Sequence, residues 1–388
     1  MSDALPPGTA HLIALASLDG VGPATLARCL ADPGPEAAWA ALVAGRPSSS
    51  PALAEVALRR GSERTAELVG EARALDPAVE LDRHLAGGRR VLVRGEPGYP
   101  ERLRHDPAPP ALLFAIGDLA ALDGPTVAVV GTRNATRPGT VLAAELGAGL
   151  AEAGVAVVSG LALGIDGAAH RGALAAAGAG SGAPVGVIAS GLDIAYPRRH
   201  AELHAAVAAA GLLLSETPLG RRPSSWRFPA RNRIIAGLAD AVVVVESRSA
   251  GGSMLTVTEA LDRGVTVLAV PGHPTAPAAA GTNDLLSEGA GMCRTVADVL
   301  VAIGSASPVG PPGPSGGAAT TPLPPDELAV LAALAEGPAA FPEVVGRTGL
   351  AIDAVATALA HLEGQGLVSR AGSWYEGSGR HLPDGRPR

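Results

Sequence analysis

An aspartate and a histidine stand four residues apart in the stretch SGLALGIDGAAHRGAL, residues 159–174. Asp166 and His170 would share one face of a helix, where an acid and an imidazole can support catalysis or bind a metal. However, no serine or cysteine nucleophile accompanies the pair, and no third residue completes a metal site. Structural bracing is therefore favoured: Gly160 and Gly164 allow close backbone approach, and Asp166 can accept hydrogen bonds from neighbouring N–H groups.

A second stretch of interest is SETPLGRRPSSWRFPARNRII, which interleaves aromatic and basic side chains. Only 2% of the chain is aromatic, yet Trp226 and Phe228 occur here together. Their neighbours include five arginines, namely Arg221, Arg222, Arg227, Arg231 and Arg233. Aromatic rings stack on unpaired bases while guanidinium groups bind phosphates. The stretch therefore favours contact with single-stranded nucleic acid over an ordinary hydrophobic lid.

Two other glycine-containing turns carry candidate phosphate-binding groups. In VGTRNATRPGT, Gly131 ends an apolar segment and Arg133 precedes a helix that is expected to begin near Thr140. Backbone N–H groups at a helix start attract anions, and a guanidinium group can bind a phosphate in two places. In SGLDIAYPRRHAELH, a Tyr-Pro corner precedes Arg198 and Arg199, as expected of a clamp on a nucleic-acid backbone.

A further turn, ESRSAGGSMLTVTEAL, places the hydroxyls of Ser253 and Thr256 at a helix start. It resembles the PGGxGTxxE turn of lysine-decarboxylase-like enzymes, which bind nucleoside monophosphates and cleave their N-glycosidic bond, with Glu259 at the position of the acid. This hydrolase is the alternative function. Met254 and Leu255 replace the glycine-rich part of that signature, and the arginine-aromatic stretch has no role in hydrolysing a small molecule.

These turns need a sheet to bring them together. Six apolar segments recur between residues 126 and 303, each followed by a glycine-containing turn and an amphipathic stretch. They are TVAVVG (126–131), VAVVSG (155–160), PVGVIASG (184–191), LLLSE (212–216), DAVVVVES (240–247) and VTVLAVPG (265–272). Continuous apolar runs predict parallel strands buried on both faces. The predicted fold class is α/β, with a Rossmann-like doubly wound, mostly parallel sheet whose turns meet at one edge.

Composition changes along the chain predict smaller flanking domains. The expected division is a small helical domain of SAM or helix-hairpin-helix type (1–80), an extended Rossmann-like DNA-binding core (81–303), a Pro/Gly linker (304–324), a winged-helix-like domain (325–378) and a tail (379–388). The third helix of the winged helix, expected at 351–362, contains no arginine, so contact with protein is favoured over duplex recognition. The hairpin at 18–30, LDGVGPATLARCL, resembles a helix-hairpin-helix, for which protein contact or packing is favoured over phosphate binding.

Charge and composition exclude several classes of function. The formal net charge is −7, but residues 126–240 hold ten arginines against seven acidic residues, and the chain contains no lysine. No lysine can therefore act as a Schiff base or phosphate clamp, and neither GxGxxG nor a P-loop occurs, so no cofactor is expected. Cys29 and Cys293 do not have metal-ligand spacing, so no metal site or disulfide is expected. A cytoplasmic location without membrane contact is predicted.

Taken in order, the turns resemble the DprA (Smf) family of bacterial DNA-processing proteins. The matching motifs are VGTR (130–133), SGLALGID (159–166), HRGAL (170–174), GLDIAYPRRH (191–200), SETP (215–218), FPARNRIIAGL (228–238), GGSMLT (251–256) and VPG (270–272). The resemblance implies a non-enzymatic mediator that binds and protects incoming single-stranded DNA without sequence preference. It also implies loading of the RecA recombinase during natural transformation, by a homodimer formed through the Rossmann-like core. A purely structural dimer scaffold is the remaining alternative, but it leaves the clustered arginines unexplained.

The resemblance assigns DNA contact to Arg133 and Arg198, with the FPxRN segment beside them. The complete predicted DNA-binding set is Gly131, Arg133, Gly160, Arg198, Arg227, Phe228, Arg231, Asn232, Ser253 and Thr256. Two positions depart from the family pattern. His200 stands where the family often has asparagine, and Ser225 stands where some relatives have a basic residue. Arg227 would lie on the same side as Ser225 if the segment were extended, and could replace that basic residue.

Overall fold

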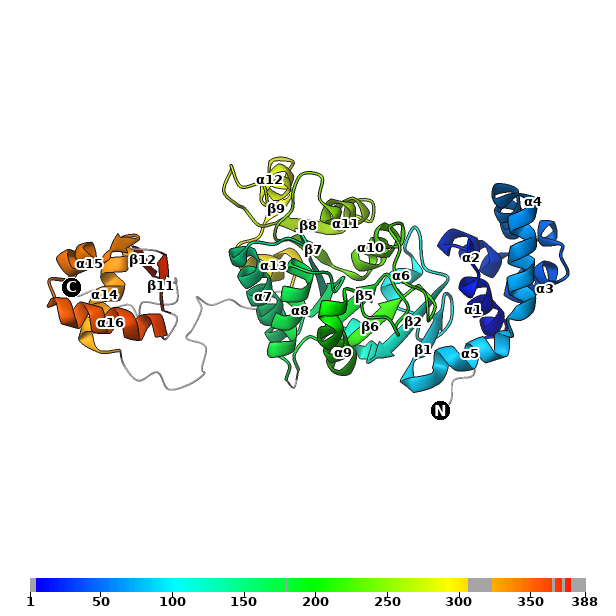
Figure 1. Cartoon of the computed structure of the whole chain (residues 1–388), viewed down its shortest axis with the longest axis horizontal. Helices are drawn as coiled ribbons and strands as arrows, with labels where there is room; N and C mark the ends of the chain where they lie inside the picture. The colour runs from blue at the N-terminus through cyan, green and yellow to red at the C-terminus, as the bar shows by residue number, and fades with distance from the viewer. Residues whose placement is uncertain (1–4, 179, 306–322, 365–366, 372–373, 378–388) are drawn as a thin grey trace. The chain divides into compact units, whose positions relative to one another are not determined.

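The computed structural model describes residues 5–178, 180–305, 323–364, 367–371 and 374–377, apart from the side chains of 364, 370 and 371 (Figure 1). The chain forms two compact units, Met1–Val309 and Gly310–Arg388, which are treated separately below. In the described residues, no helix combines the length and the apolar character needed to cross a membrane. The predicted linker lies almost wholly, and the predicted tail wholly, outside the described residues.

The first unit is built around a nine-stranded sheet with the order β1-β2-β6-β5-β4-β3-β7-β8-β9. Its strands are β1 (Arg90–Val93), β2 (Leu112–Gly117), β3 (Thr126–Val130), β4 (Ala156–Ser159), β5 (Pro184–Ile188), β6 (Leu212–Ser215), β7 (Ala241–Val244), β8 (Thr266–Ala269) and β9 (Gly291–Met292). The ladders from β6 through β3 to β9 are parallel, while β1–β2 and β2–β6 are antiparallel. The mostly parallel doubly wound sheet is thus confirmed.

Helices cover both faces of this sheet, which explains why its strands are continuously apolar. One face packs against α7 (Arg137–Glu152), α8 (Ile165–Ala175), α9 (Ala201–Ala210) and α13 (Val296–Ala302). The other packs against α6 (Glu101–Arg104), α10 (Arg227–Leu238), α11 (Gly252–Leu261) and α12 (Ala280–Ser287). Successive residues of β3 alternate between the two cores, Val127 and Val129 facing α7 and α8, and Ala128 and Val130 facing α10.

The N-terminal region of the unit is helical and packs on the β1–β2 side of the sheet (Figure 1). Its helices are α1 (Thr9–Ser17), α2 (Pro23–Ala31), α3 (Pro35–Val43), α4 (Pro51–Ala74) and α5 (Pro77–Leu85). Proline at the first or second position starts four of them, where the missing N–H costs no helical hydrogen bond. Leu12 and Leu53 share one apolar cluster with Val91 and Phe114 of the sheet. The division between the helical domain and the core was expected after residue 80, and helix α5 continues through that position. This boundary stays a prediction.

The second unit contains α14 (Pro325–Ala335), α15 (Phe341–Thr348) and α16 (Ile352–Gly364) around one apolar cluster. Strands β10 (Ala339–Ala340), β11 (Val368–Ala371) and β12 (Trp374–Gly377) form an antiparallel sheet with the order β10-β12-β11. Three helices followed by a two-stranded wing agree with the expected winged helix. Short 3₁₀ turns, all in the first unit, are η1 (Pro47–Ser49), η2 (Ala86–Gly88), η3 (Leu119–Leu122) and η4 (Arg198–His200).

The order of the strands defines where a ligand would bind. From β3 the chain passes through α7, α8 and α9 to β4, β5 and β6 on one side, and then through α10 to β7 on the other side of β3. The winding therefore reverses between β3 and β7. In open α/β sheets, ligands bind in the crevice outside the carboxyl ends of the strands at such a reversal.

Candidate nucleic-acid interface

A groove of about 590 Å³ lies at this reversal, and we call it the switch-point groove. Its walls come from the turns that follow β3, β4 and β7 and from the first half of α10. Seven members of the predicted DNA-binding set line it: Gly131, Arg133, Phe228, Arg231, Asn232, Ser253 and Thr256. Gly131 and Thr256, 125 positions apart in the chain, therefore meet in one groove, as the parallel sheet predicts.

The turn that carries Arg133 is held in place by Glu246, the second residue after β7. The carboxylate of Glu246 accepts hydrogen bonds from the backbone N–H of Thr136, at 2.9 Å, and from the Thr136 hydroxyl. Its backbone oxygen accepts from the N–H of Thr132 at 2.7 Å. Helix α7 begins at Arg137 and not near Thr140, because the Thr136 hydroxyl caps it by accepting from the N–H of Gly139 at 3.1 Å.

Arg133 stacks against an aromatic cluster beside the groove. The guanidinium carbon of Arg133 lies 4.8 Å from the centroid of the Phe228 ring. The centroid of the Tyr196 ring lies 5.6 Å from that of Phe228, with the two rings tilted by 46°. These three residues, together with Gly160 and Arg231, line a smaller depression that we call the aromatic hollow. A cation and two rings, from two turns and the start of α10, are the groups that bases and phosphates need together.

Arg231 is a buried cation at the centre of the site, and only 8% of the residue is exposed. Its Nη1 donates to the carbonyl oxygen of Gly160 at 2.9 Å and also to that of Val187. Burial lowers the pKa of Arg231 to about 10, a shift that the nearby Asp166 carboxylate opposes, so the group is charged at neutral pH. Burial likewise raises the pKa of Asp166, and Arg231 counters that effect most strongly. Arg231 therefore holds strand ends together and contributes positive charge to the groove.

Two glycines of the predicted set are needed for packing inside the protein. A Cβ on Gly131 would lie 2.5 Å from Cγ1 of Ile165 and 2.8 Å from the backbone oxygen of Glu246. A Cβ on Gly160 would overlap the guanidinium group of Arg231. Their close approach is thus to neighbouring turns of this chain, and direct contact between these glycines and DNA stays a prediction.

The wall beyond β7 combines predicted and unexpected residues. Ser253 and Thr256 are both buried, and the Ser253 hydroxyl donates to that of Ser247 at 2.8 Å. Arg248 lines the same wall and was not in the predicted set. Arg248 lies within the turn ESRSAGG, which was interpreted through the hydroxyls of Ser253 and Thr256 that follow it. The arginine in this turn was a signal from which a phosphate contact could have been predicted. Arg133, Arg231 and Arg248 outnumber Asp166, the one acid among the described residues that line the groove, so its lining is mainly cationic.

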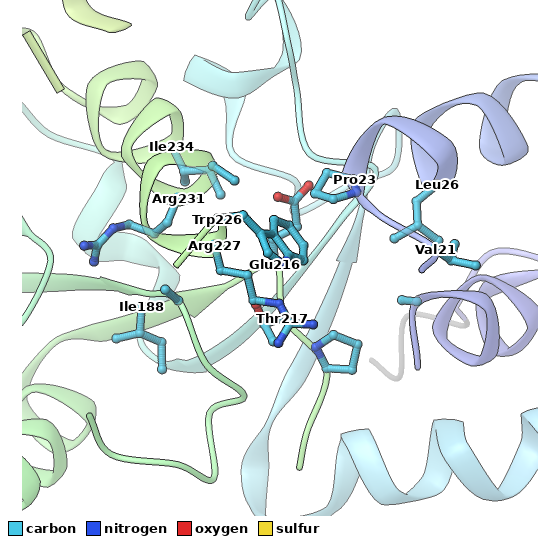
Figure 2. Close-up of a pocket in the computed structure, with 14 residues that line it drawn as sticks. Val21, Pro23, Leu26, Ile188, Glu216, Thr217, Trp226, Arg227, Arg231 and Ile234 are labelled. Carbon is cyan, nitrogen blue, oxygen red and sulfur yellow. The ribbon is translucent and has the colours of Figure 1, made fainter. Parts of the chain in front are cut away.

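The FPxRN segment is helical, which corrects the extended arrangement considered for Arg227. Helix α10 begins at Arg227. Pro229 therefore falls within its first turn, where proline is tolerated. Arg227 faces a third depression, the junction hollow, which lies between α10 and α2 and is lined by Val21, Pro23, Trp226 and Arg227 among others (Figure 2). Arg227 therefore lies outside the switch-point groove, while Ser225 lines it.

Two further arginines of the stretch are engaged within the protein. Nη2 of Arg233 lies 2.6 Å from each carboxylate oxygen of Glu216. Nη2 of Arg221 donates to the backbone oxygen of Ser17. Arg221 and Arg233 therefore connect elements of the fold. The sequence pattern alone did not distinguish this role from phosphate binding.

Arg198 lies at the edge of the site. It is exposed on η4, directly after Pro197, which lines the aromatic hollow. His200, the departure from the family pattern, is buried, and its Nδ1 lies 3.0 Å from the backbone oxygen of Leu161. The imidazole therefore links η4 to the turn after β4. One ring nitrogen is enough for this hydrogen bond, so the link does not require the asparagine of the family pattern.

The Asp166 and His170 pair braces two different segments. Asp166 Oδ2 accepts from the N–H of Gly160 at 3.1 Å, while His170 Nε2 lies 3.2 Å from the backbone oxygen of Val185. Burial lowers the pKa of His170 to about 4, so the ring is neutral at pH 7 and donates this bond. Among the residues that the structure describes, no group of three or more metal-ligating side chains comes together. The arrangement agrees with the structural interpretation.

Glu259, the acid required by the hydrolase alternative, is directed elsewhere. Its Oε2 pairs with Nη1 of Arg263 at 2.5 Å, and Arg263 also pairs with Asp106 at 2.7 Å. Glu259 does not belong to the described residues that line the switch-point groove. An acid in this ion-pair network is poorly placed to act on a substrate in that groove.

Comparison with known proteins identifies the family. Residues 90–304 match the model of the family described as DNA recombination-mediator protein A, and residues 314–372 match that of the DprA winged helix domain. The chain belongs to the DprA family. Protein Smf of Synechocystis is 33% identical over 93% of this chain and 96% of its own length. A putative DNA processing protein DprA of Mycobacterium tuberculosis is 38% identical over 82% of this chain and 85% of its own.

Solved DprA structures share the fold. DNA processing protein A from Streptococcus pneumoniae aligns with a TM-score of 0.61 and 30% identity, over 76% of this chain and 98% of that one. DNA processing protein A from Helicobacter pylori, whose structure is described as showing a single-stranded DNA binding mode, aligns with a TM-score of 0.50 and 28% identity, over 56% of this chain and 96% of that one. As a DprA protein, the chain is a member of a family of DNA recombination mediators.

Proposed function

We propose that this DprA protein binds single-stranded DNA in the switch-point groove and the aromatic hollow, without reading its sequence. The observation that carries the proposal is the stacking of Arg133 on Phe228, 4.8 Å from guanidinium carbon to ring centroid, at the mouth of a groove that also contains Arg231 and Arg248. A cationic groove with an aromatic platform suits a flexible polyanion whose bases are unpaired. The single-stranded DNA described for the Helicobacter pylori relative supports the same ligand class.

The role in the cell that we propose follows from this ligand. The protein would protect incoming single-stranded DNA and load the RecA recombinase onto it, as a homodimer formed through the Rossmann-like core in the cytoplasm. It would act as a mediator that does not catalyse a reaction; the pairing of Glu259 with Arg263 argues against the competing hydrolase. Co-purification with the host's recombinase, in the presence and absence of DNA, tests the partner separately from the ligand.

Binding of a fluorescent oligonucleotide over a salt series tests the ligand. Arg133→Ala and Arg198→Ala should weaken affinity and flatten the dependence on salt, because a variant that neutralises one phosphate fewer also releases about one counterion fewer. Arg171→Ala is the matched control, since Arg171 is exposed on α8 and lines none of the three depressions formed by the described residues.

If both Arg133→Ala and Arg198→Ala bind like the wild type at every salt concentration, the groove is not the DNA site. Release of free base from AMP that is lost in Glu259→Gln would instead favour the hydrolase. The two outcomes are separable, because Glu259→Gln leaves all three arginines of the groove unchanged.

A further inference from the structure

We infer that the junction hollow is an additional subsite for single-stranded DNA, in which a base stacks on Trp226 while helix α2 forms the opposite wall. The inference rests on the proposed function, because it extends the path of the same ligand. It also gives the N-terminal helical region a part in DNA binding, although its GVG hairpin was interpreted above as a packing or protein-contact element. Figure 2 shows Trp226 and Arg227 of the α10 start between Pro23 and Val21 on one side and Ile188 and Arg231 on the other.

The junction hollow is continuous with the DNA site proposed above. It shares Ile188, Ala189 and Arg231 with the aromatic hollow. The aromatic hollow in turn shares Arg133, Phe228 and Arg231 with the switch-point groove. All three depressions therefore have Arg231 in their lining and lie next to one another, so a strand bound in the groove past Phe228 would approach Trp226.

Trp226 offers an aromatic surface at this point. Trp226 is 51% exposed, whereas Trp39 in the helical region is 7% exposed. The guanidinium carbon of Arg227 lies 5.0 Å from the centroid of the Trp226 ring, and Nη1 of Arg227 donates to the backbone oxygen of Arg222 at 2.7 Å. Arg227 thus holds the indole in place while the remaining exposed surface of the ring is available for stacking.

The charges around the hollow also suit DNA. Arg227 lines the hollow and is half-buried, and Arg222, whose backbone oxygen accepts from Arg227, is exposed. Among the described residues that line the hollow, the one acid is Glu216, which Arg233 binds through both carboxylate oxygens at 2.6 Å. The acid at the GVG hairpin, Asp19, pairs with Arg60 at 3.1 Å. Both acids are thus paired with an arginine, and Arg222 and Arg227 add positive charge that can attract a phosphate backbone.

The wall from the N-terminal region is held against the core by named contacts. Arg221 donates to the backbone oxygen of Ser17, at the end of α1. The N–H of Leu219 donates to Nε2 of His84 at 3.0 Å, and Nδ1 of His84 lies 2.7 Å from the backbone oxygen of Glu80. These bonds flank the arginine-aromatic segment on its N-terminal side, so they hold the N-terminal region against it.

The size of the hollow specifies how the ligand lies. The enclosed volume is about 30 Å³, enough for one or two water molecules and too small to enclose a base. A base would therefore lie on the rim, against the indole of Trp226, with Val21 and Pro23 excluding water from its other edge. This geometry suits a flat group in an extended strand rather than a free nucleotide held in a closed pocket.

Oligothymidylates of two lengths test the inference with the full chain. A strand of about 5 nucleotides fills the groove alone, whereas one of about 20 reaches the junction hollow, given typical sites of ~4–16 nucleotides. Trp226→Ala should weaken binding of the long strand about tenfold and leave the short strand unaffected. Pro23→Glu should do the same by placing a carboxylate on the α2 wall. Leu58→Glu is its matched control, a residue of the same helical region that is 85% exposed and outside the hollow.

Fluorescence gives an independent readout. In a chain that carries Trp39→Phe and Trp374→Phe, Trp226 is the remaining tryptophan, and its emission should be quenched by the long strand and not by the short one. Equal affinity of wild type, Trp226→Ala and Pro23→Glu for the long strand, or unchanged emission on saturation, would overturn the inference while leaving the groove intact. Failure of the wild type to bind either strand would instead overturn the proposed function.

Discussion

Nη1 of Arg231 donates a hydrogen bond to the backbone oxygen of Gly160 at 2.9 Å, which joins the first turns of α10 to the end of β4. The same nitrogen reaches the backbone oxygen of Val187, near the end of β5. One guanidinium group therefore joins two strand ends at the edge of the sheet where we propose the DNA site. Because Arg231 also lines the groove, the stability of the fold and the proposed DNA site depend on the same residue.

Arg231→Ala should lower the free energy of unfolding by about 3 kcal/mol or more. The substitution removes the guanidinium donor from two buried carbonyl oxygens and leaves the buried Asp166 without the cation that most strongly offsets its burial. Urea denaturation followed by circular dichroism measures the loss.

Arg171→Ala provides the comparison for this measurement, because it removes a guanidinium group from an exposed helix position. Its free energy of unfolding should stay within about 0.5 kcal/mol of the wild type. Equal stability of Arg231→Ala and wild type would contradict the bracing role.

Much of the core could be predicted from the sequence because its strands are continuous apolar runs. The run TVAVVG at 126–131 corresponds to β3, Thr126–Val130, and both faces of that strand are buried. Convergence of the turns followed from parallel pairing alone, since the carboxyl ends of such strands lie at one edge. Gly131, Arg133 and Phe228 accordingly line one groove.

Partners that lie far apart in the chain could not be predicted in the same way. Arg233 looked like its neighbours in the sequence, yet Glu216 engages it, and no local pattern specifies which arginine an acid will select. The helical start of α10 was also hidden, because Pro229 suggests extended backbone unless it falls in a first turn. The bracing of Thr136 by Glu246 depends on the β3–β7 pairing, which only the fold provides.

Arg133→Lys should bind single-stranded DNA about fivefold more weakly than the wild type although the charge is kept. A lysine ammonium group cannot stack its plane on the Phe228 ring, and stacked guanidinium groups contribute ~1 kcal/mol. Fluorescence anisotropy at fixed salt measures the change. The salt dependence should remain close to that of the wild type, in contrast to Arg133→Ala.

Arg248→Ala tests the residue that the sequence interpretation omitted. Because Arg248 lines the wall of the groove after β7, its removal should weaken the binding of DNA of every sequence to the same extent. The slope of log affinity against log salt concentration should fall in magnitude by about 1. Binding to homopolymeric and mixed strands over a salt series measures both quantities. A loss confined to one base composition would show that Arg248 contacts bases rather than phosphate.

His170 should make the protein sensitive to mild acid. Its pKa is about 4 in the folded chain, because burial disfavours the imidazolium, and about 6.5 in the unfolded chain. Between these values the unfolded chain binds more protons, so stability is complete above pH ~6.5 and falls as the pH drops toward about 4. The contribution at stake is ~3 kcal/mol, to be measured by denaturant unfolding at a series of pH values.

The variant that isolates this effect is His170→Gln, because a glutamine amide can still donate to the backbone oxygen of Val185 and does not titrate. Burial also lowers the pKa values of His84 and His204, so the variant should retain part of the acid sensitivity. The difference between wild type and variant should therefore grow as the pH falls below ~6.5, in favour of His170→Gln. Parallel stability curves over this range would mean that His170 binds the same number of protons in the folded and unfolded chains, contrary to a buried, neutral ring.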